Sequence, residues 1–360
     1  MFSALDWSLF FRSGLIFSTK PGYVVLSWGS VKESATPLKE SHSWSFFYSD
    51  FYLKKTRYLQ FENTIECSTK DLFVHLKTEL QQKGSVGKRE FSDLDFSFFE
   101  KQFITIQKAI EKKTITKAVP VIFQKSESVF SLSEKKYLLL SLLDPNNAAI
   151  SKSLHIYGLF LNANGILGAS PEILFSYTKK NTTLKSMALA GTGLSTDKPE
   201  SLLHSAKDLK EHSIVSDYLN MIMCVLGDKA TLVKSDTYEW DIKHLKHLRK
   251  DFQISAPQFC LKKTIKNLHP TPALGTSPQS QWNFLKTLEA SMDRLSYGAP
   301  LVSISPEGNV KAVVAIRNIQ WTQASLWLFV GCGIIAKSNL NKEFQELHNK
   351  IKSVKLLLGL

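Results

Sequence analysis

Three charged residues near the C-terminus have the types and spacing that metal or anion chemistry requires. Glu343, Glu346 and Lys350 lie in a segment that we expect to be helical from Asn341 to about Leu358. On a helix the three charges fall on one face, beside an apolar stripe that would face the core. The stripe consists of Phe344, Leu347, Ile351, Val354 and Leu358. Charges at the border of such a stripe can point into a cleft, or Glu346 and Lys350 can form an exposed (i, i+4) ion pair.

A pair of glycines precedes this helix and offers backbone donors. The segment Gly331-Cys332-Gly333-Ile334-Ile335 follows a predicted strand over residues 325–330. Glycines let a backbone approach a ligand closely, and they leave N–H groups bare for an anion. Most glycine pairs are merely turns, so this one indicates a site only in combination with the charged helix.

The elements that must position these residues follow no regular βαβ order. Apolar periodicity predicts helices at residues 96–113, 199–226, 280–295 and 341–358. Strands are predicted at 23–28, 115–123, 153–162, 173–177, 184–189, 312–320 and 325–330, with a turn near Gly165. Pro120 favours an edge strand or a bulge. The pattern predicts an α+β fold with antiparallel sheets. Residues 1–95 hold few motifs, so we expect a divergent N-terminal part there and a catalytic region over residues 96–360.

Composition excludes several classes of protein. The 360 residues are 43% hydrophobic and 21% charged, which argues against a disordered chain or a disulfide scaffold. Basic residues (45 Lys+Arg) outnumber acidic ones (32 Asp+Glu), but they occur as scattered pairs, which favours an ordinary surface over nucleic-acid binding. The 4 cysteines lack the spacing of zinc or redox motifs. Without a run long enough to span a membrane, we expect a soluble, cytoplasmic protein with no membrane partner.

Eight segments resemble, in order, those of the chorismate-utilising enzymes. They are Ile115-Thr116-Lys117-Ala118-Val119, Ser170-Pro171-Glu172, Leu189-Ala190-Gly191-Thr192, Lys210-Glu211-His212, His269-Pro270-Thr271-Pro272-Ala273, Tyr297-Gly298-Ala299-Pro300, Ala315-Ile316-Arg317, and the glycine segment at 331–333 with Glu343, Glu346 and Lys350. The family includes isochorismate, salicylate, anthranilate and aminodeoxychorismate synthases. The resemblance implies one large domain with two antiparallel β-sheets packed face to face and helices outside, which binds chorismate and Mg²⁺.

The resemblance implies a metal site made of carboxylates. Glu211 and Glu346 would bind Mg²⁺ directly. Asp208 and Glu343, one helical turn away from them, would be further or water-mediated contacts. Hard carboxylate oxygens suit Mg²⁺, which keeps several waters and commonly bridges to a substrate anion.

The resemblance also implies a substrate site. Arg317 and Lys350 would bind the carboxylates of chorismate, Arg317 in a bidentate manner. Hydrogen bonds to the ring and side chain would come from Gly191, Thr192, Tyr297, Gly331, Cys332 and Gly333. His247 fits the family's active-site histidine best, with His244 as a rival.

Two positions separate the reactions within the family. Chorismate carries a ring hydroxyl at C4, and its replacement by a nucleophile at C2 needs an activated nucleophile and a protonated leaving group. Lys117 stands where isochorismate and salicylate synthases have the lysine that deprotonates water, and Glu172 resembles the general acid. Ala190 replaces the attacking lysine of aminodeoxychorismate synthases, which removes that covalent route. The alternative for Lys117 is an exposed strand residue.

The sequence departs from the family at several positions. Ile122 stands where isochorismate synthases commonly have arginine, and Pro120 lies in the same strand. Gly298-Ala299 has the reverse of the usual order, and Val302 replaces a glycine. These changes leave the acid, base, metal and carboxylate positions intact, so we expect an active but divergent enzyme.

The sequence therefore predicts an Mg²⁺-dependent isochorismate synthase. Salicylate synthase, which also eliminates pyruvate, is the first alternative, and a catalytically inactive chorismate-binding relative is another. An ammonia-using synthase with a glutaminase subunit is disfavoured by Lys117, so we expect no such subunit. The segment 246–250 resembles the menaquinone branch of the family, which favours a role in menaquinone biosynthesis. Relatives that use water are commonly monomers, and we expect a monomer.

Overall fold

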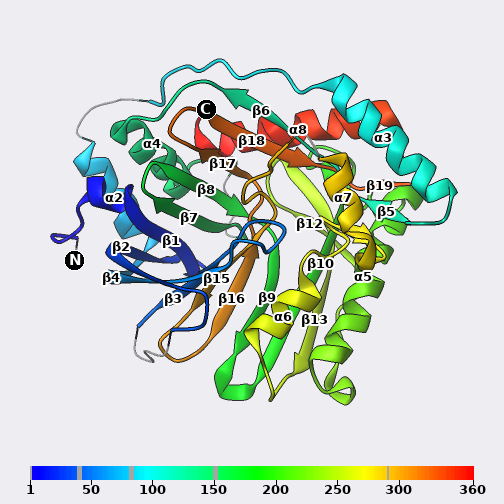
Figure 1. The fold of residues 1–360 in the computed structure, drawn as a ribbon, viewed down its shortest axis with the longest axis horizontal. Coiled ribbons are helices and arrows are strands. Elements are labelled where there is room, and N and C mark those ends of the chain that lie inside the picture. The colour runs from blue at the N-terminus through cyan, green and yellow to red at the C-terminus, as the bar shows by residue number, and fades with distance from the viewer. Residues whose placement is uncertain (1, 39–42, 81–84, 148, 150–152, 290–291) are drawn as a thin grey trace.

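One large antiparallel sheet forms the frame of the molecule (Figure 1). The computed structural model describes residues 2–38, 43–80, 85–147, 149, 153–289 and 292–360. Within these residues the large sheet has 16 strands. Their order is β11 (Val233–Lys234), β13 (Leu245–Ser255), β10 (Thr183–Leu194), β9 (Ile173–Thr178), β16 (Val310–Val314), β15 (Pro300–Ile304), β3 (Ser45–Tyr48), β4 (Arg57–Ser68), β2 (Tyr23–Ser34), β1 (Ser13–Lys20), β7 (His155–Leu161), β8 (Asn164–Ser170), β17 (Asn318–Trp321), β18 (Leu326–Gly331) and β6 (Val121–Ser126), and β12 (Tyr238–Asp241) pairs with β13.

A second, much smaller sheet has three short strands. It consists of β14 (Thr276–Ser277), β5 (Lys117–Ala118) and β19 (Ile334–Ile335), with β5 in the middle. Lys117 therefore faces Ser277 on one side and Ile335 on the other, in antiparallel register. This sheet joins three segments that are far apart in the sequence.

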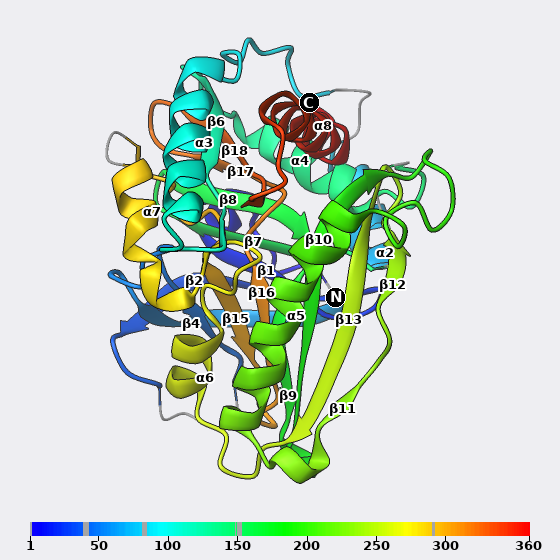
Figure 2. The ribbon, with the colours of Figure 1, turned by 90° about the vertical axis from the view of Figure 1, so that its right-hand side faces the viewer.

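Helices cover the large sheet on its outer side (Figures 1 and 2). They are α1 (Trp7–Phe10), α2 (Thr69–Glu79), α3 (Phe96–Glu111), α4 (Leu132–Leu143), α5 (Ala206–Leu226), α6 (Leu261–Leu268), α7 (Asn283–Leu288) and α8 (Leu340–Leu358), with 3-10 turns at Lys179–Asn181, Lys229–Thr231 and Gln279–Gln281. Helix α5 runs along β10 and β13, whereas α8 packs on β18 and against α3 and α4. Among the described helices, none is long and apolar enough to cross a membrane.

Strands β1 and β7 of the large sheet are buried on both faces. Leu15 and Phe17 of β1 belong to a small apolar cluster that also contains Tyr157 and Val313, from β7 and β16. Ile16, between them, points to the opposite face and joins the main core beneath the helices. Side chains alternate across a strand, so a strand buried on both faces reads as a continuous apolar run.

The predicted fold class is confirmed, but the predicted pair of sheets needs correction. The structure has helices and antiparallel strands, as expected for α+β. We expected two sheets packed face to face, and the structure has one continuous curled sheet beside a small second one. The large sheet is continuous because β3 pairs with β15, through Val302 and Phe47 among others, and β1 pairs with β7.

Pro120 separates two strands where one was expected. The predicted strand at 115–123 divides into β5 and β6, and β6 is an edge strand of the large sheet. The predicted strand at 312–320 likewise divides into β16 and β17. The break lies at Arg317, whose φ of 54° is left-handed and cannot continue a strand.

Three other boundaries differ from the sequence-based expectation. Strand β10 does not stop at Leu189 but continues to Leu194, through a bulge at Gly191. Helix α5 begins at Ala206 rather than at residue 199, because the Ser205 side chain caps it. The helix expected at 280–295 is wrong in length: α7 is short, and residues 290–291 lie outside the described residues. Strands β1 to β4, from the first 95 residues, join the same large sheet as β13, and a boundary at residue 95 stays a prediction.

Candidate active site

Two adjoining cavities contain most of the predicted site residues. The first is lined by Pro171, Glu172, Leu189, Ala190, Gly191, Thr192, Glu211, His247, Ala273, Leu274, Tyr297, Ile316, Arg317, Phe329, Val330, Gly331, Cys332, Gly333, Lys350 and Val354. The second is lined by Thr192, Gly193, Leu194, Asp197, Ser205, Lys207, Asp208, Leu245, Lys337, Asn339, Lys342, Glu343, Gln345, Glu346 and Asn349. Thr192 lines both cavities, so they meet at the end of β10.

Lys117 lies beside the first cavity and is fully buried, with 0% of its surface exposed. Its Nζ lies 3.0 Å from Glu211 Oε1. Gly333 packs against this ion pair, and a Cβ atom there would lie only 2.6 Å from Lys117 Cε, so the position requires glycine. The alternative of an exposed strand residue for Lys117 is therefore wrong.

Glu172 lies in the first cavity, directly after β8. Its backbone N–H donates to Ser170 Oγ over 3.1 Å, and Ser170 is itself fully buried. Burial raises the pKa of Glu172 to about 7, although the charges of Lys117 and Lys350 oppose that rise. A carboxyl group with this pKa is partly protonated at neutral pH and can serve as a general acid.

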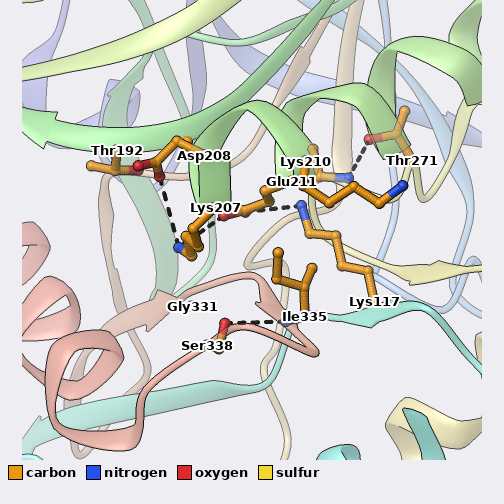
Figure 3. Close-up of polar contacts among 12 residues, drawn as sticks. Lys117, Thr192, Lys207, Asp208, Lys210, Glu211, Thr271, Gly331, Ile335 and Ser338 are labelled. Carbon is orange, nitrogen blue, oxygen red and sulfur yellow. Dashed lines mark hydrogen bonds and ion pairs between the residues drawn. The ribbon is translucent and has the colours of Figure 1, made fainter. Parts of the chain in front are cut away.

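Four carboxylates from two helices gather around the ammonium group of Lys207, and Figure 3 shows the two from α5, Asp208 and Glu211. Lys207 Nζ lies 3.0 Å from Glu211 Oε2 and 3.8 Å from Asp208 Oδ1, both on α5. It also lies 3.2 Å from Glu343 Oε1 on α8. Glu346, one turn along α8, lines the same cavity. Sequence reasoning did not identify Lys207, because its position in the cluster depends on how α5 and α8 meet.

The charges of these groups depend on one another. Burial alone would raise the pKa of Glu211, but the adjacent Lys117 and Lys207 ammonium groups hold it at about 2. Burial and the negative charge of Glu346 raise the pKa of Glu343 to about 7, against the attraction of Lys207. Lys117 and Lys207 therefore do not neutralise all the negative charge of the carboxylate cluster.

Another part of the lining of the first cavity, made by Arg317, His247 and Lys350, is cationic and hydrogen-bonded. His247 Nδ1–H donates to the Gly191 carbonyl over 3.0 Å, and its Nε2 accepts from Arg317 Nη2 over 3.0 Å. Burial, with the charges of Arg317 and Lys350, lowers the pKa of His247 to about 3. His247 is therefore a neutral imidazole that orients Arg317. The rival His244 is exposed.

Local backbone features place Arg317. Gly191 has a φ of 76° in the β10 bulge, which turns its carbonyl toward the imidazole. Tyr157 donates its hydroxyl hydrogen to the Ile316 carbonyl over 2.7 Å, and Asn318 donates to the Tyr157 oxygen over 2.8 Å. These bonds hold the left-handed Arg317 in place, and such conformations concentrate at functional sites.

Lys350 links the cationic side to the carboxylate cluster. Its Nζ donates to the Gly331 carbonyl over 2.8 Å and lies 2.8 Å from Glu346 Oε1. The expected (i, i+4) pair is thus present, but it borders the cavity rather than open solvent. Burial lowers the pKa of Lys350, but the negative charge of Glu346 raises it more, to about 12.

The sequence model of the chorismate-binding enzyme family matches residues 48–359 of this chain. The chain belongs to this family. A vibriobactin-specific isochorismate synthase of Vibrio cholerae is 32% identical over 205 residues, which cover 54% of this chain and 51% of that protein. An anthranilate synthase component 1 of Saccharolobus solfataricus is 24% identical over 309 residues, 79% of this chain and 69% of that protein. This chorismate-binding enzyme spans about half the length of the isochorismate synthases it matches.

A solved structure has the same fold as this chorismate-binding enzyme. MenF, the menaquinone-specific isochorismate synthase from Escherichia coli, superposes with a TM-score of 0.78 at 14% identity. The superposition covers 99% of this chain and 92% of that chain. At this identity the likeness supports the fold, and the roles of individual residues rest on the geometry above.

The donor set of this chorismate-binding enzyme suits a hard divalent cation. Among the described residues, no group of three or more histidine, cysteine or acidic side chains already has the arrangement of a metal site. The Lys207 ammonium nevertheless has carboxylate oxygens of Asp208, Glu211 and Glu343 within 4 Å, so it marks a place where a cation is held. Carboxylates are the ligands that Mg²⁺ prefers.

The departures from the family lie in buried positions. Ile122 on β6 pairs with Val330, and Val302 on β15 pairs with Phe47; both are buried in apolar clusters. Neither lines the first cavity. The segment 246–250, which resembled the menaquinone branch, begins with Lys246, whose buried Nζ donates to the Lys198 carbonyl over 2.6 Å.

Proposed function

We propose that this protein is an isochorismate synthase, which converts chorismate to isochorismate with Mg²⁺. The observation that carries the proposal is a buried lysine and a buried carboxyl at one cavity, Lys117 and Glu172, opposite a cationic pair, Arg317 and Lys350. Chorismate presents two carboxylates and a leaving hydroxyl, and this arrangement offers a partner for each.

The proposed reaction needs one base and one acid. A neutral Lys117 amine accepts a proton from water, and the water oxygen bonds to C2 of the ring. The two ring double bonds shift, from C1=C2 and C5=C6 to C1=C6 and C4=C5, as the C4–oxygen bond breaks. Glu172 donates its proton so that the hydroxyl leaves as water. Each proton transfer of this kind contributes about 10²- to 10⁴-fold to the rate.

Other residues bind and orient the substrate. Arg317, fixed by neutral His247, and Lys350 would bind carboxylates of the substrate. Thr192, Tyr297 and the backbone at 331–333 would complete the ring site. Mg²⁺, held by Glu211 and Glu346 with Asp208 and Glu343 nearby, would neutralise a substrate carboxylate.

Product analysis tests this proposal. Purified protein would be incubated with chorismate and Mg²⁺, with and without ammonium, and the products separated by chromatography. We expect isochorismate, without pyruvate and without an aminated product. Salicylate with pyruvate would assign the salicylate synthase reaction, and binding without turnover would assign an inactive relative. Either result contradicts the proposal. A role in menaquinone synthesis and a monomeric state stay predictions.

A further inference from the structure

Lys207 has an environment that its position in the sequence does not explain. It lies in the first turn of α5, where its ammonium group contacts Asp208 and Glu211 of the same helix (Figure 3). It also contacts Glu343 of α8. Glu211 and Glu343, which it joins, are buried at 7% and 2% exposure. The Lys207 side chain itself remains 23% exposed, so it reaches the cluster from its open edge.

Lys207 contacts one proposed direct ligand of the metal, Glu211, and both proposed outer contacts, Asp208 and Glu343. Asp208, Glu211 and Glu343 each have an oxygen within 4 Å of Nζ, and Glu211 uses its other oxygen for Lys117. An Mg²⁺ ion would need the oxygen of its direct ligand Glu211 at about 2.0 to 2.1 Å and would use Asp208 and Glu343 directly or through its waters. A lysine ammonium and Mg²⁺ cannot occupy the same few ångströms, because both are cations that need the same lone pairs.

We infer that Lys207 is a tethered counter-cation of the metal site, which joins α5 to α8 in the metal-free protein and is displaced when Mg²⁺ binds. The identity of the displacing cation rests on the proposed function. In the metal-free protein the ammonium group compensates carboxylates that would otherwise repel one another across the two helices. Lys207 is thus a positioning residue that lowers the apparent affinity for the metal.

The second cavity has room for the displaced Lys207 side chain. The second cavity, of about 420 Å³, is lined by Lys207 itself and, among others, by Asp197 and Leu245. A lysine stem has four flexible methylenes, and its strongly hydrated ammonium is stable in such an open space. Displacement therefore needs rotation of one side chain and no movement of the helices.

Competition between Lys207 and Mg²⁺ raises the apparent dissociation constant of the metal by a measurable factor. When a ligand binds only a minor state, its apparent dissociation constant rises by the reciprocal of that state's population. If the displaced state of Lys207 is populated about one time in ten, removal of the charge tightens Mg²⁺ binding about tenfold. The metal-free protein would at the same time lose the ion pairs that join α5 to α8.

Calorimetric titration of Mg²⁺ into protein without chorismate tests the inference. We expect Lys207→Met to bind Mg²⁺ about tenfold more tightly than wild type, to melt at a lower temperature without metal and to gain more in melting temperature when Mg²⁺ is added. Lys210→Met is the matched control: it removes the same charge from an exposed position on the same helix and should leave the affinity unchanged. Unchanged or weaker binding in Lys207→Met would overturn the inference.

A measurement on the wild-type protein needs no variant. Acetylation of lysines followed by mass spectrometry reports whether each amine is free. We expect Lys207 to be modified slowly without metal and severalfold faster with saturating Mg²⁺, while the rate at Lys210 stays constant. Equal rates at Lys207 in both conditions would contradict displacement. Neither test uses chorismate, so a protein that binds Mg²⁺ as described but makes no isochorismate would overturn only the proposed function.

Discussion

The two sides of the candidate site are stabilised in different ways. On the cationic side, Arg317, His247 and Lys350 each have a hydrogen bond to backbone or to one another, so their positions are set by the fold. On the anionic side, the carboxylates of α5 and α8 depend on lysine side chains for compensation. Under the proposed function, this contrast means that the partners of the substrate's carboxylates are fixed in advance, whereas the carboxylate side is completed by a bound cation.

Removal of the proposed base, Lys117, should have the largest effect. We expect Lys117→Met to lower kcat by about 10²- to 10⁴-fold, because water would lose its proton acceptor. Glu211 would also lose an ion pair, so a melting curve must show that the variant is folded. Wild-type activity in a folded Lys117→Met protein would reject Lys117 as the base.

The pH dependence of turnover tests the acid. Glu172 donates a proton only in its neutral form, which is populated below its pKa of about 7. The contribution of this group to kcat should be complete well below pH 7 and fall about tenfold per pH unit well above it. Glu172→Gln should lose most activity and this alkaline decline together. A variant that keeps the same decline would assign the titration to another group.

Arg317→Lys tests the preset geometry of the cationic side. The Arg317 guanidinium donates a hydrogen bond to His247 Nε2 and keeps other N–H groups for a carboxylate. A lysine keeps the charge but cannot bind a carboxylate through two parallel hydrogen bonds. We expect KM for chorismate to rise about tenfold, with a smaller change in kcat. Steady-state kinetics would show this. A KM unchanged from wild type would mean that the guanidinium fork is not used.

The smallest expected effect is on the start of α5. Ser205 accepts a hydrogen bond from the Asp208 N–H over 3.3 Å and caps the turn that holds the carboxylates. Ser205→Ala should destabilise the protein by about 1 kcal/mol, measured by denaturant unfolding. Mg²⁺ binding should weaken modestly while chorismate binding without metal is unaffected. If the affinities for Mg²⁺ and for chorismate fall equally, the cap stabilises the whole site and not the carboxylate side alone.

Most of the residues that the sequence singled out lie together in the structure, but the contacts between them could not be predicted. The helical spacing of Glu343, Glu346 and Lys350 placed them beside the apolar stripe of α8, and the structure has them there. The ordered motifs assigned Glu172 and Arg317 to different roles in one active site, and both line one cavity. Local periodicity and motif order suffice for such residues.

The remaining features depend on contacts between distant segments. The burial of Lys117 follows from strands at 276–277 and 334–335 that pair on either side of it, and two-residue strands leave no periodic pattern. The position of Lys207 follows from the packing of α5 near α8. The left-handed Arg317 divides what reads as one strand, because a single residue's φ leaves no trace in apolar periodicity.

The most direct test of the central claim follows the oxygen atom. Chorismate would be converted by the purified protein with Mg²⁺ in water labelled with oxygen-18, and the product analysed by chromatography and mass spectrometry. If Lys117 activates water for attack at C2 and Glu172 releases the C4 hydroxyl, isochorismate will carry one labelled oxygen at C2. Isochorismate without the label, or the absence of isochorismate, would contradict the account.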